Sequence, residues 1–344
     1  MIAIHDSPSG FHPRWINYCE SNGISYRLVN CYSSRLISDL DGCRVLLWHH
    51  AQSDPRDILI ARQILFALEH AGLHVFPDFR TAWHFDDKVG QKYLLEALTI
   101  EAMPAHVFTE RQAALDWANT AEFPKVFKLR RGAGSAGVQL VRNKGQAQKL
   151  IRRAFGRGFP VYDPWGSLKD RYLKFRLGLT GIKDVFKGLA RLLYRPRFSR
   201  ILGSEKGYVY FQDFASANDS DTRVVVIGSR AFAIQRHVRP GDFRASGSGL
   251  IDHDPSNIDQ RCIELAFSAA RKLGGTCICF DFVLDAESLP KVIEISYGFS
   301  QTGYEACPGF WTSDFRYHPG RFDPQGWMVE QILEKAMSAK PMSI

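Results

Sequence analysis

The order of apolar and polar positions along the chain predicts alternating strands and helices. Short apolar runs typical of strands are separated by segments whose apolar residues recur every three to four positions, as in helices. The expected strands of the first part are residues 1–5, 25–29, 44–48 and 73–76, and its expected helices are residues 13–22 and 56–71. This order predicts a small α/β domain with a parallel sheet.

The later part of the chain is richer in β-structure. A helix is expected to begin at Asp86, Asp87 and Lys88, and Gly228-Ser229 is typical of a β-hairpin turn. The other expected helices are residues 111–119, 145–155 and 256–273. Strands are expected at residues 105–109, within 124–141, and at 208–211, 223–227, 231–235, 277–284 and 291–296. The last two strands are joined by a turn at residues 285–290, so they should pair as neighbours.

A basic, glycine-rich segment over residues 123–138 is the most informative stretch. A β-run ends at Lys128, a turn with Gly132, Gly134 and Gly137 follows, and a second β-run covers residues 138–141. Glycine amides can approach phosphate oxygens closely because no Cβ intervenes, and Lys128 supplies a positive charge. The segment predicts a flap over nucleotide phosphates, although a simple hairpin with a glycine-rich loop has the same pattern.

Two acidic residues in the last expected hairpin bear on that choice. Asp281 and Glu294 lie on neighbouring strands among apolar residues. Paired strands can bring two such carboxylates side by side, and buried carboxylates are costly unless a cation compensates them. Mg²⁺ is the natural candidate, because it takes oxygen ligands and shares them with nucleotide phosphates. The alternative is a pair of acids on a solvated sheet face.

Taken together, these motifs resemble the ATP-grasp superfamily, and most closely the branch with ribosomal-protein glutamate ligases and glutathione synthetases. The resemblance covers about residues 75–300. It implies an α/β fold of ATP-grasp type, with an N-terminal parallel-sheet domain, a small lid subdomain and a C-terminal antiparallel-sheet subdomain. The expected parts are residues 1–85 (N-terminal domain), 86–160 (lid), 161–206 (basic insertion), 207–318 (C-terminal subdomain) and 319–344 (C-terminal helix and tail).

The resemblance also implies roles for individual residues. Residues 210–214 resemble the family's adenine hinge, with Asp213 in place of glutamate, and Asp221-Thr222-Arg223 resembles its Asp-Ile-Arg. The implied nucleotide-binding residues are Lys88, Lys128, Gly132, Gly134, Ser135, Gly137, Gln212, Asp213, Phe214, Asp221 and Ser246. The implied catalytic residues are Arg223, Arg236 and Arg244, and the implied metal ligands are Asp281, Glu294 and Ser296.

Two positions depart from the family pattern. The chain has Ser296 in the family's Glu-x-Asn motif and Ser246 in its Arg-Ser-Asn motif, so a hydroxyl replaces an amide at each. A serine hydroxyl can ligate Mg²⁺ but reaches less far than asparagine. The expected cofactors are therefore ATP with one or two Mg²⁺ ions.

The resemblance implies an ATP-dependent carboxylate–amine or carboxylate–thiol ligase acting through an acyl phosphate on small molecules. An amino acid or a uronic acid of a cell-surface polysaccharide precursor is the suggested carboxylate. Two alternatives stay open: a non-catalytic ATP-binding regulator, and an ATP-grasp kinase that phosphorylates its substrate without ligation.

The net charge of +8 is concentrated in one segment. Residues 166–206 hold eleven Lys or Arg against three acids, whereas nucleic-acid binding would spread basic residues over a domain face. Nucleic acid is therefore not an expected partner. Within this segment, residues 180–194 predict a basic amphipathic helix with Lys183, Lys187 and Arg191. It could be a packed helix with a solvated face, a clamp for an anionic substrate, or, over residues 180–197, a surface for anionic lipid or a partner.

Neither cysteine spacing nor the N-terminus indicates secretion. The seven cysteines include no Cys-x-x-Cys pair, so we expect neither a disulfide nor a structural metal. The first residues lack the basic and apolar regions of a signal peptide, and no apolar run is long enough for a membrane span. A cytoplasmic protein is expected, and a homodimer is one assembly that it could form.

Overall fold

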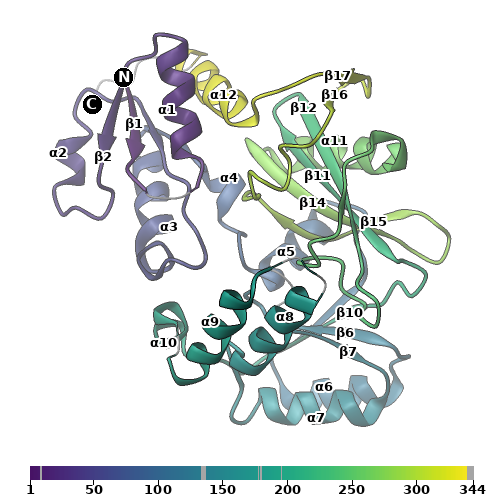
Figure 1. The fold of residues 1–344 in the computed structure, drawn as a ribbon. Helices are drawn as coiled ribbons and strands as arrows, with labels where there is room; N and C mark the ends of the chain where they lie inside the picture. Colours follow the sequence, from purple (N-terminus) through teal and green to yellow (C-terminus); the bar gives the residue numbers. More distant parts are fainter. Residues whose placement is uncertain (8–9, 133–136, 177, 179, 195, 339–344) are drawn as a thin grey trace.

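The computed structural model describes residues 1–7, 10–132, 137–176, 178, 180–194 and 196–338 (Figure 1). Among these residues the strands form three larger sheets and one two-stranded ribbon. Each larger sheet has its own helices, and the predicted mixture of parallel and antiparallel sheets is confirmed.

The first sheet is parallel and has the strand order β2-β1-β3-β4. Its strands are β1 (Ile2–His5), β2 (Tyr26–Val29), β3 (Val45–Leu47) and β4 (His74–Phe76). Its helices are α1 (His12–Ser21), α2 (Leu36–Asp39) and α3 (Pro55–His70). The start of α3 is set locally, because Asp54 accepts a hydrogen bond from the Arg56 amide and Pro55 suits the first helical position.

The second sheet is antiparallel and has the order β5-β10-β6-β7. Its strands are β5 (Ala105–Phe108), β6 (Lys125–Lys128), β7 (Val138–Val141) and β10 (Val209–Asp213). Helices α6 (Arg111–Thr120) and α7 (Lys144–Ala154) cover one face (Figure 1). The expected boundary at residue 207 is wrong for β10: Val209 and Phe211 join the apolar core of this sheet, so β10 belongs to the lid.

The third sheet has seven strands in the order β15-β14-β11-β12-β16-β17, with β13 beside β12. Its strands are β11 (Ser220–Ile227), β12 (Arg230–His237), β13 (Ile251–Asp252), β14 (Cys277–Leu284), β15 (Pro290–Ser296), β16 (Gly309–Thr312) and β17 (Tyr317–Pro319). A 3₁₀ turn (Pro255–Asn257) precedes the helix that follows β13.

Both faces of this sheet are covered. Val225 and Ile227 pack toward the first sheet and α12 (Pro324–Ser338), while Val224 and Val226 pack against α11 (Gln260–Leu273). The short α4 (Phe79–Ala82) leads to α5 (Lys88–Ala97), whose Leu95 joins the core with α11. The expected lid start at residue 86 is therefore wrong for α5, because its apolar face is buried on the third sheet.

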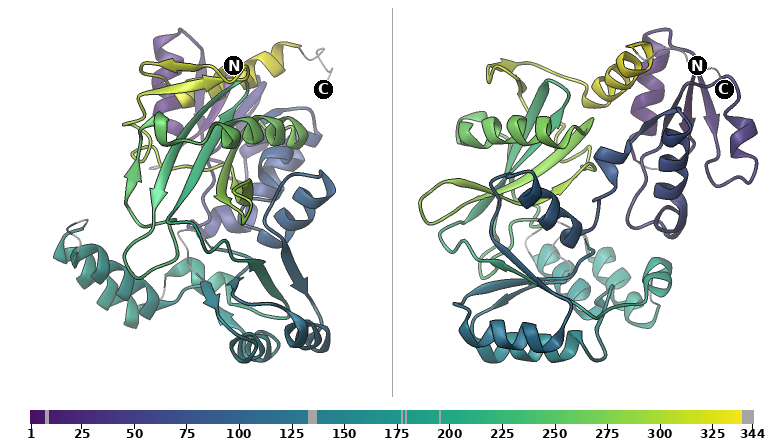
Figure 2. Two further views of the ribbon diagram at one scale, coloured as in Figure 1. Left: turned by 90° about the vertical axis from the view of Figure 1, so that its right-hand side faces the viewer. Right: turned by 180° about the vertical axis from the view of Figure 1, so that it is seen from behind.

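The basic insertion is helical. It contains α8 (Pro164–Arg176), α9 (Ile182–Leu193) and α10 (Arg197–Leu202), and the ribbon of β8 (Phe159–Pro160) with β9 (Ser204–Glu205) closes its base. The predicted amphipathic helix is confirmed as α9. Figure 2 shows the α8–α9 hairpin projecting from the rest of the chain. Among the described residues we find no helix with the length and apolar character that a membrane span needs.

Candidate functional site

A cleft of about 820 Å³, including the solvent at its mouth, contains most of the predicted site residues. It is lined by residues of the second sheet, the third sheet and the start of α5. The predicted residues that line it are Lys88, Lys128, Gly132, Gln212, Asp213, Phe214, Asp221, Arg244, Ser246, Asp281 and Glu294. Arg223, Arg236, Ser296 and Gly137 are not in this lining. Gly134 and Ser135 lie outside the described residues.

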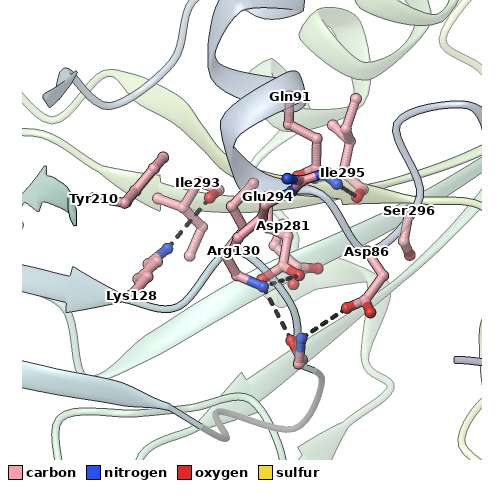
Figure 3. Close-up of polar contacts among 12 residues, drawn as sticks. Asp86, Gln91, Lys128, Arg130, Tyr210, Asp281, Ile293, Glu294, Ile295 and Ser296 are labelled. Atoms are coloured by element: carbon pink, nitrogen blue, oxygen red, sulfur yellow. Dashed lines mark hydrogen bonds and ion pairs between the residues drawn. The ribbon is translucent and has the colours of Figure 1, made fainter. Parts of the chain in front are cut away.

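The two acids of the predicted metal site face each other across neighbouring strands. Asp281 of β14 pairs in register with Glu294 of β15. Lys88 Nζ lies 3.1 Å from Glu294 Oε1, and Lys128 Nζ, reaching over from β6, donates to the Ile293 carbonyl at 3.4 Å. Figure 3 shows Asp281 and Glu294 side by side, between Lys128 and Asp86. Two cations and two carboxylates thus meet at one end of the cleft.

Burial changes the protonation of Lys128. Its side chain is almost wholly buried, and this desolvation lowers the pKa of the ammonium to about 8, although the charge of Glu294 opposes the shift. Lys128 therefore holds its proton at neutral pH and loses it in mildly alkaline solution.

Arg223 and Arg236 hold Asp281 in place instead of lining the cleft. Arg236 donates to Asp221 at 2.6 Å and 2.8 Å, and its Nη2 lies 3.0 Å from Asp281 Oδ2. Arg223 Nε lies 3.1 Å from Asp281 Oδ1. Burial disfavours the ionised form of Asp281, but the two guanidinium groups outweigh it and lower the pKa of Asp281. Both arginines are therefore positioned to keep this carboxylate charged.

Ser296 is engaged by its neighbours. Its hydroxyl accepts a hydrogen bond from Arg223 Nη2 at 2.8 Å and donates one to the Gly298 carbonyl at 3.2 Å. A hydroxyl has one proton and two lone pairs, so one lone pair is left for a cation. This arrangement favours Asp281 and Glu294 over Ser296 as primary ligands.

The remaining donor set fits Mg²⁺. Asp281 Oδ1 is buried and, although close to Arg223, has no hydrogen-bond partner of acceptable geometry among the described residues. Such an oxygen is satisfied by a hard cation that takes oxygen ligands. No group of three or more His, Cys, Asp or Glu residues in the described part of the chain could hold a metal. Phosphate and water oxygens would therefore have to complete the coordination.

The start of α5 holds the first part of the glycine-rich loop, a tie that the sequence did not predict. The Gly132 amide donates to Asp86 Oδ1 at 2.7 Å, and Lys88 Nζ donates to the Gly132 carbonyl at 3.0 Å. Arg130 lies 2.8 Å from Asp87 Oδ2. In this arrangement the Gly132 amide already donates its hydrogen bond to Asp86. A phosphate would therefore have to displace the Asp86 carboxylate before it could accept a hydrogen bond from this amide.

Gly137 has a conformational role. Its φ of +71° suits glycine, and a Cβ there would lie 2.7 Å from Leu129 Cδ1. Because it has no side chain, Gly137 allows the backbone at the start of β7 to pack directly against Leu129. It is not in the cleft lining.

Asp213 of the expected hinge turns its carboxylate toward the second sheet. It accepts hydrogen bonds from His106 at 3.3 Å and from Lys125 at 2.7 Å, and these lower the pKa of Asp213 although burial opposes the shift. Next to it, Phe214 packs edge-on against Phe243, with ring centroids 6.0 Å apart. The two rings give this end of the cleft an apolar wall, as a nucleobase would require.

Two supporting residues escaped the sequence reasoning. Gln91 of α5 donates to the Ile295 carbonyl at 2.7 Å and accepts from the Ile295 amide at 3.2 Å, which ties α5 to edge strand β15 beside Glu294 (Figure 3). Asp242 accepts from Arg244 Nε at 2.9 Å and Nη2 at 2.8 Å, which aims this cleft-lining arginine. For the first of them, the sequence offered one signal, a glutamine about one helical turn after Lys88.

Arg239 links the basic insertion to the loop that borders the cleft. Its buried guanidinium donates to the carbonyls of Ser248, at 2.9 Å, and Gly247, and lies 2.5 Å from Asp170 of α8. The insertion is thus attached directly to the loop between β12 and β13.

We expect Arg239→Met to lower the free energy of unfolding by about 2–3 kcal/mol, because the carbonyl of buried Ser248, the carbonyl of Gly247 and the carboxylate of Asp170 all lose a charged donor. Asp170→Asn should lower the free energy of unfolding by less than about 1 kcal/mol, since that carboxylate is part-exposed and also pairs with Lys174. Urea denaturation of both variants tests this order. Equal losses of unfolding free energy in the two variants would show that the hydrogen bonds from Arg239 to the carbonyls are not the main stabilising contacts.

The comparisons with known proteins agree with this geometry. A family model described as the RimK-like ATP-grasp domain matches residues 194–307. The chain has an ATP-grasp fold. No curated protein sequence matches it. The resemblance and the fold class inferred from the motifs are confirmed.

Solved ATP-grasp structures share the fold over nearly the whole chain. D-cycloserine synthetase DcsG superposes with a TM-score of 0.59 at 14% identity, over 97% of this chain and 99% of that one. A RimK domain ATP-grasp protein from Sphaerobacter thermophilus gives 0.55 at 15% identity, over 97% and 100%. The D-alanine–D-alanine ligase from Bacillus anthracis, complexed with ATP, gives 0.54 at 12% identity, over 98% and 97%.

Proposed function

We propose that this ATP-grasp protein is an ATP-dependent ligase that activates a carboxylate as an acyl phosphate and joins it to an amine or a thiol. The observation that carries the proposal is the Asp281–Glu294 pair between Lys88 and Lys128 at one end of the cleft. Oxygen ligands for Mg²⁺ next to two buried ammonium groups suit the polyphosphate of a nucleotide.

The proposed reaction has two steps. A carboxylate oxygen attacks the γ-phosphorus of ATP, which releases ADP and leaves an acyl phosphate. The amine then attacks the acyl carbon and releases phosphate. Mg²⁺ held by Asp281 and Glu294 would neutralise charge on the phosphates.

The side chains of the cleft serve mainly to position and to neutralise. Lys88 and Lys128 place positive charge beside the phosphates. Arg244, aimed by Asp242, is the one of the three predicted arginines that lines the cleft, so we assign it to the transferred phosphoryl group. Arg223 and Arg236 act through Asp281 and are positioning residues.

Trapping with hydroxylamine tests the proposal. The protein would be incubated with ATP, Mg²⁺, hydroxylamine and either amino acids or uronic acids, our two candidate classes of carboxylate. A ligase gives hydroxamate and ADP in equal amounts, and only when a carboxylate is present. A phosphorylated product without hydroxamate would indicate a kinase instead, and nucleotide binding with no ADP release would indicate a regulator.

We also propose that α9 contacts an anionic lipid surface, which would place the enzyme at a membrane while it remains cytoplasmic. The side chains of Phe186 and Leu193 are 62% and 86% exposed, and Ile182 and Leu189 share that face. Lys183, Lys187 and Arg191 form no ion pair with any residue that the structure describes. An exposed apolar stripe flanked by unpaired cations suits an anionic bilayer surface. The packed-helix interpretation accounts only for the side of α9 that meets α8.

Flotation with vesicles of phosphatidylglycerol and phosphatidylcholine tests this contact. We expect the intact protein to float and a Phe186→Asp, Leu193→Asp variant to stay in the dense fraction. Ile37→Asp, which changes an exposed isoleucine on α2, is the matched control and should float like the unchanged protein. Equal flotation of all three would exclude the contact.

Association of the protein into a homodimer stays a prediction.

A further inference from the structure

A second, smaller pocket lies at the carboxyl edge of the parallel sheet. It has a volume of about 320 Å³, including solvent at its mouth. Residues after β3, the first turns of α3, the Phe85-Asp86 link, Arg131 of the loop and Leu202 of α10 form its walls. The carboxyl ends of parallel strands are where ligands bind in open α/β sheets.

Two arginines in this pocket have no carboxylate partner. Arg62 of α3 donates from Nη1 to the Trp83 carbonyl at 3.0 Å, which leaves its other donors free. Neither Arg62 nor Arg131 forms an ion pair within the part of the chain that the structure describes. Burial lowers the pKa of Arg62, and the nearby charge of Arg131 lowers it further, although Asp87 and Asp86 oppose the shift. An anion between them would relieve this repulsion.

A buried histidine points to a ligand independently. His50 is 4% exposed and lines the pocket, and its Nε2 has no hydrogen-bond partner among the described residues. Burial lowers the pKa of His50 to about 3, so the ring is neutral. A buried ring nitrogen without a partner is rare unless a ligand or water satisfies it.

The acids of the pocket accept hydrogen bonds from other donors and form no ion pair with the two arginines among the described residues. Asp57 accepts from the Tyr32 hydroxyl at 2.8 Å and from the Ala51 amide at 2.7 Å. Asp86 accepts from the Gly132 amide, and burial raises the pKa of both carboxyl groups. The groups of the pocket that remain to bind an anion are therefore the two guanidinium groups.

The pocket adjoins the nucleotide cleft. Asp86 and Arg131 line the pocket, whereas Lys88 and Gly132 line the cleft. Arg131 and Gly132 are consecutive, so their Cα atoms are about 3.8 Å apart. A molecule seated in the pocket is thus next to the end of the cleft that holds Glu294.

We propose that the pocket binds a carboxylate group of the substrate, with Arg62 and Arg131 as its cationic partners and His50 Nε2 as a neutral one. Planar guanidinium groups match carboxylates bidentately, which favours this anion. The inference rests on the proposed ligase function for its role, because it supplies the site for the carboxylate to be activated. Leu202 would cover the bound group, which gives the insertion a part in substrate binding.

Calorimetric titration of the full chain without nucleotide or Mg²⁺ tests the site. The probes are L-glutamate, D-glucuronate and inorganic phosphate. We expect at least one carboxylate to bind, and Arg131→Gln to raise its Kd by about tenfold or more, as for loss of a charge-assisted hydrogen bond. Arg62→Gln should do the same, but it also removes the bond to Trp83, so Arg131→Gln is the cleaner variant. Arg142→Gln changes an exposed arginine outside the pocket and should leave the Kd unchanged.

The outcomes separate this site from the proposed reaction. Glu294→Ala should leave carboxylate binding intact even where turnover is lost, so a failed ligase assay would not remove the site. The site is overturned if neither carboxylate binds, if Arg131→Gln binds it as tightly as the unchanged protein, or if saturating ADP displaces it. Phosphate binding as tight as that of the better carboxylate would overturn the assignment to a carboxylate.

Discussion

Replacing Glu294 by glutamine should lower ATP turnover by roughly 10²–10³-fold, the loss typical when one group that stabilises transition-state charge is removed. The substitution keeps the size of the side chain but removes a charge that faces Lys88 at 3.1 Å and, in the proposed site, one of two carboxylate ligands of Mg²⁺. ADP release should fall, and the Mg²⁺ concentration needed for half-maximal turnover should rise. A coupled ADP assay over a range of Mg²⁺ concentrations measures both quantities.

Glu287→Gln provides the matched control for that experiment. Glu287 is an exposed acid in the turn between β14 and β15, so its replacement removes the same charge from the same hairpin without entering the cleft. Its turnover should equal that of the unchanged protein. If Glu294→Gln also retained full turnover with an unchanged Mg²⁺ requirement, the metal assignment would be wrong.

Nucleotide affinity should depend on pH through Lys128. The pKa of about 8 means that the free protein carries the charge below about pH 7 and loses it above pH 8. Since the protonated form binds phosphate, the Kd for Mg·ADP should be flat below pH 7 and rise by up to about tenfold per unit well above pH 8. The charged groups that face Lys128 are Glu294, Lys88, Asp281 and Asp221.

Lys128→Met should remove this dependence. At pH 7 the variant should bind Mg·ADP about 10–100-fold more weakly, as expected for loss of a charge-assisted hydrogen bond, and its Kd should stay level between pH 7 and 9. The difference in the Kd for Mg·ADP between the variant and the unchanged protein should therefore become smaller as the pH rises. Lys149→Met, which changes an exposed lysine on α7, should keep the original profile. A pH profile shared by all three proteins would place the titrating group elsewhere.

Local patterns predicted several structural elements of the candidate site. The β-run to Lys128, the glycine turn and the hairpin with Asp281 and Glu294 are each encoded by short-range periodicity and turn residues, which act within a few positions. The in-register pairing of these two acids follows from the hairpin between them. Helices with strong apolar spacing, such as α3 and α9, were also found near their observed bounds.

Elements with weak signals were missed, and elements with shared signals were assigned to the wrong part of the fold. Helix α8 has no buried residue and little amphipathic character, so no apolar stripe marked it in the sequence. The sequence pattern of strand β10 is compatible with either antiparallel sheet. Only the packing of Phe211 in the core of the second sheet assigns the strand to the lid. For α5, the burial of Leu95 against the third sheet decided its partner.

The sequence by itself determined the local features of the candidate site: a helix start at Asp87-Lys88, a basic glycine-rich segment after Lys128, and two acids on one hairpin. The tertiary structure alone decided how these features are supported, because those contacts join positions far apart in the chain. It placed Arg223 and Arg236 on Asp281, joined Arg239 to Asp170, and gathered His50, Arg62 and Arg131 around one pocket. Spacing along a chain cannot specify such partners, since long-range packing selects them only when the sheets meet.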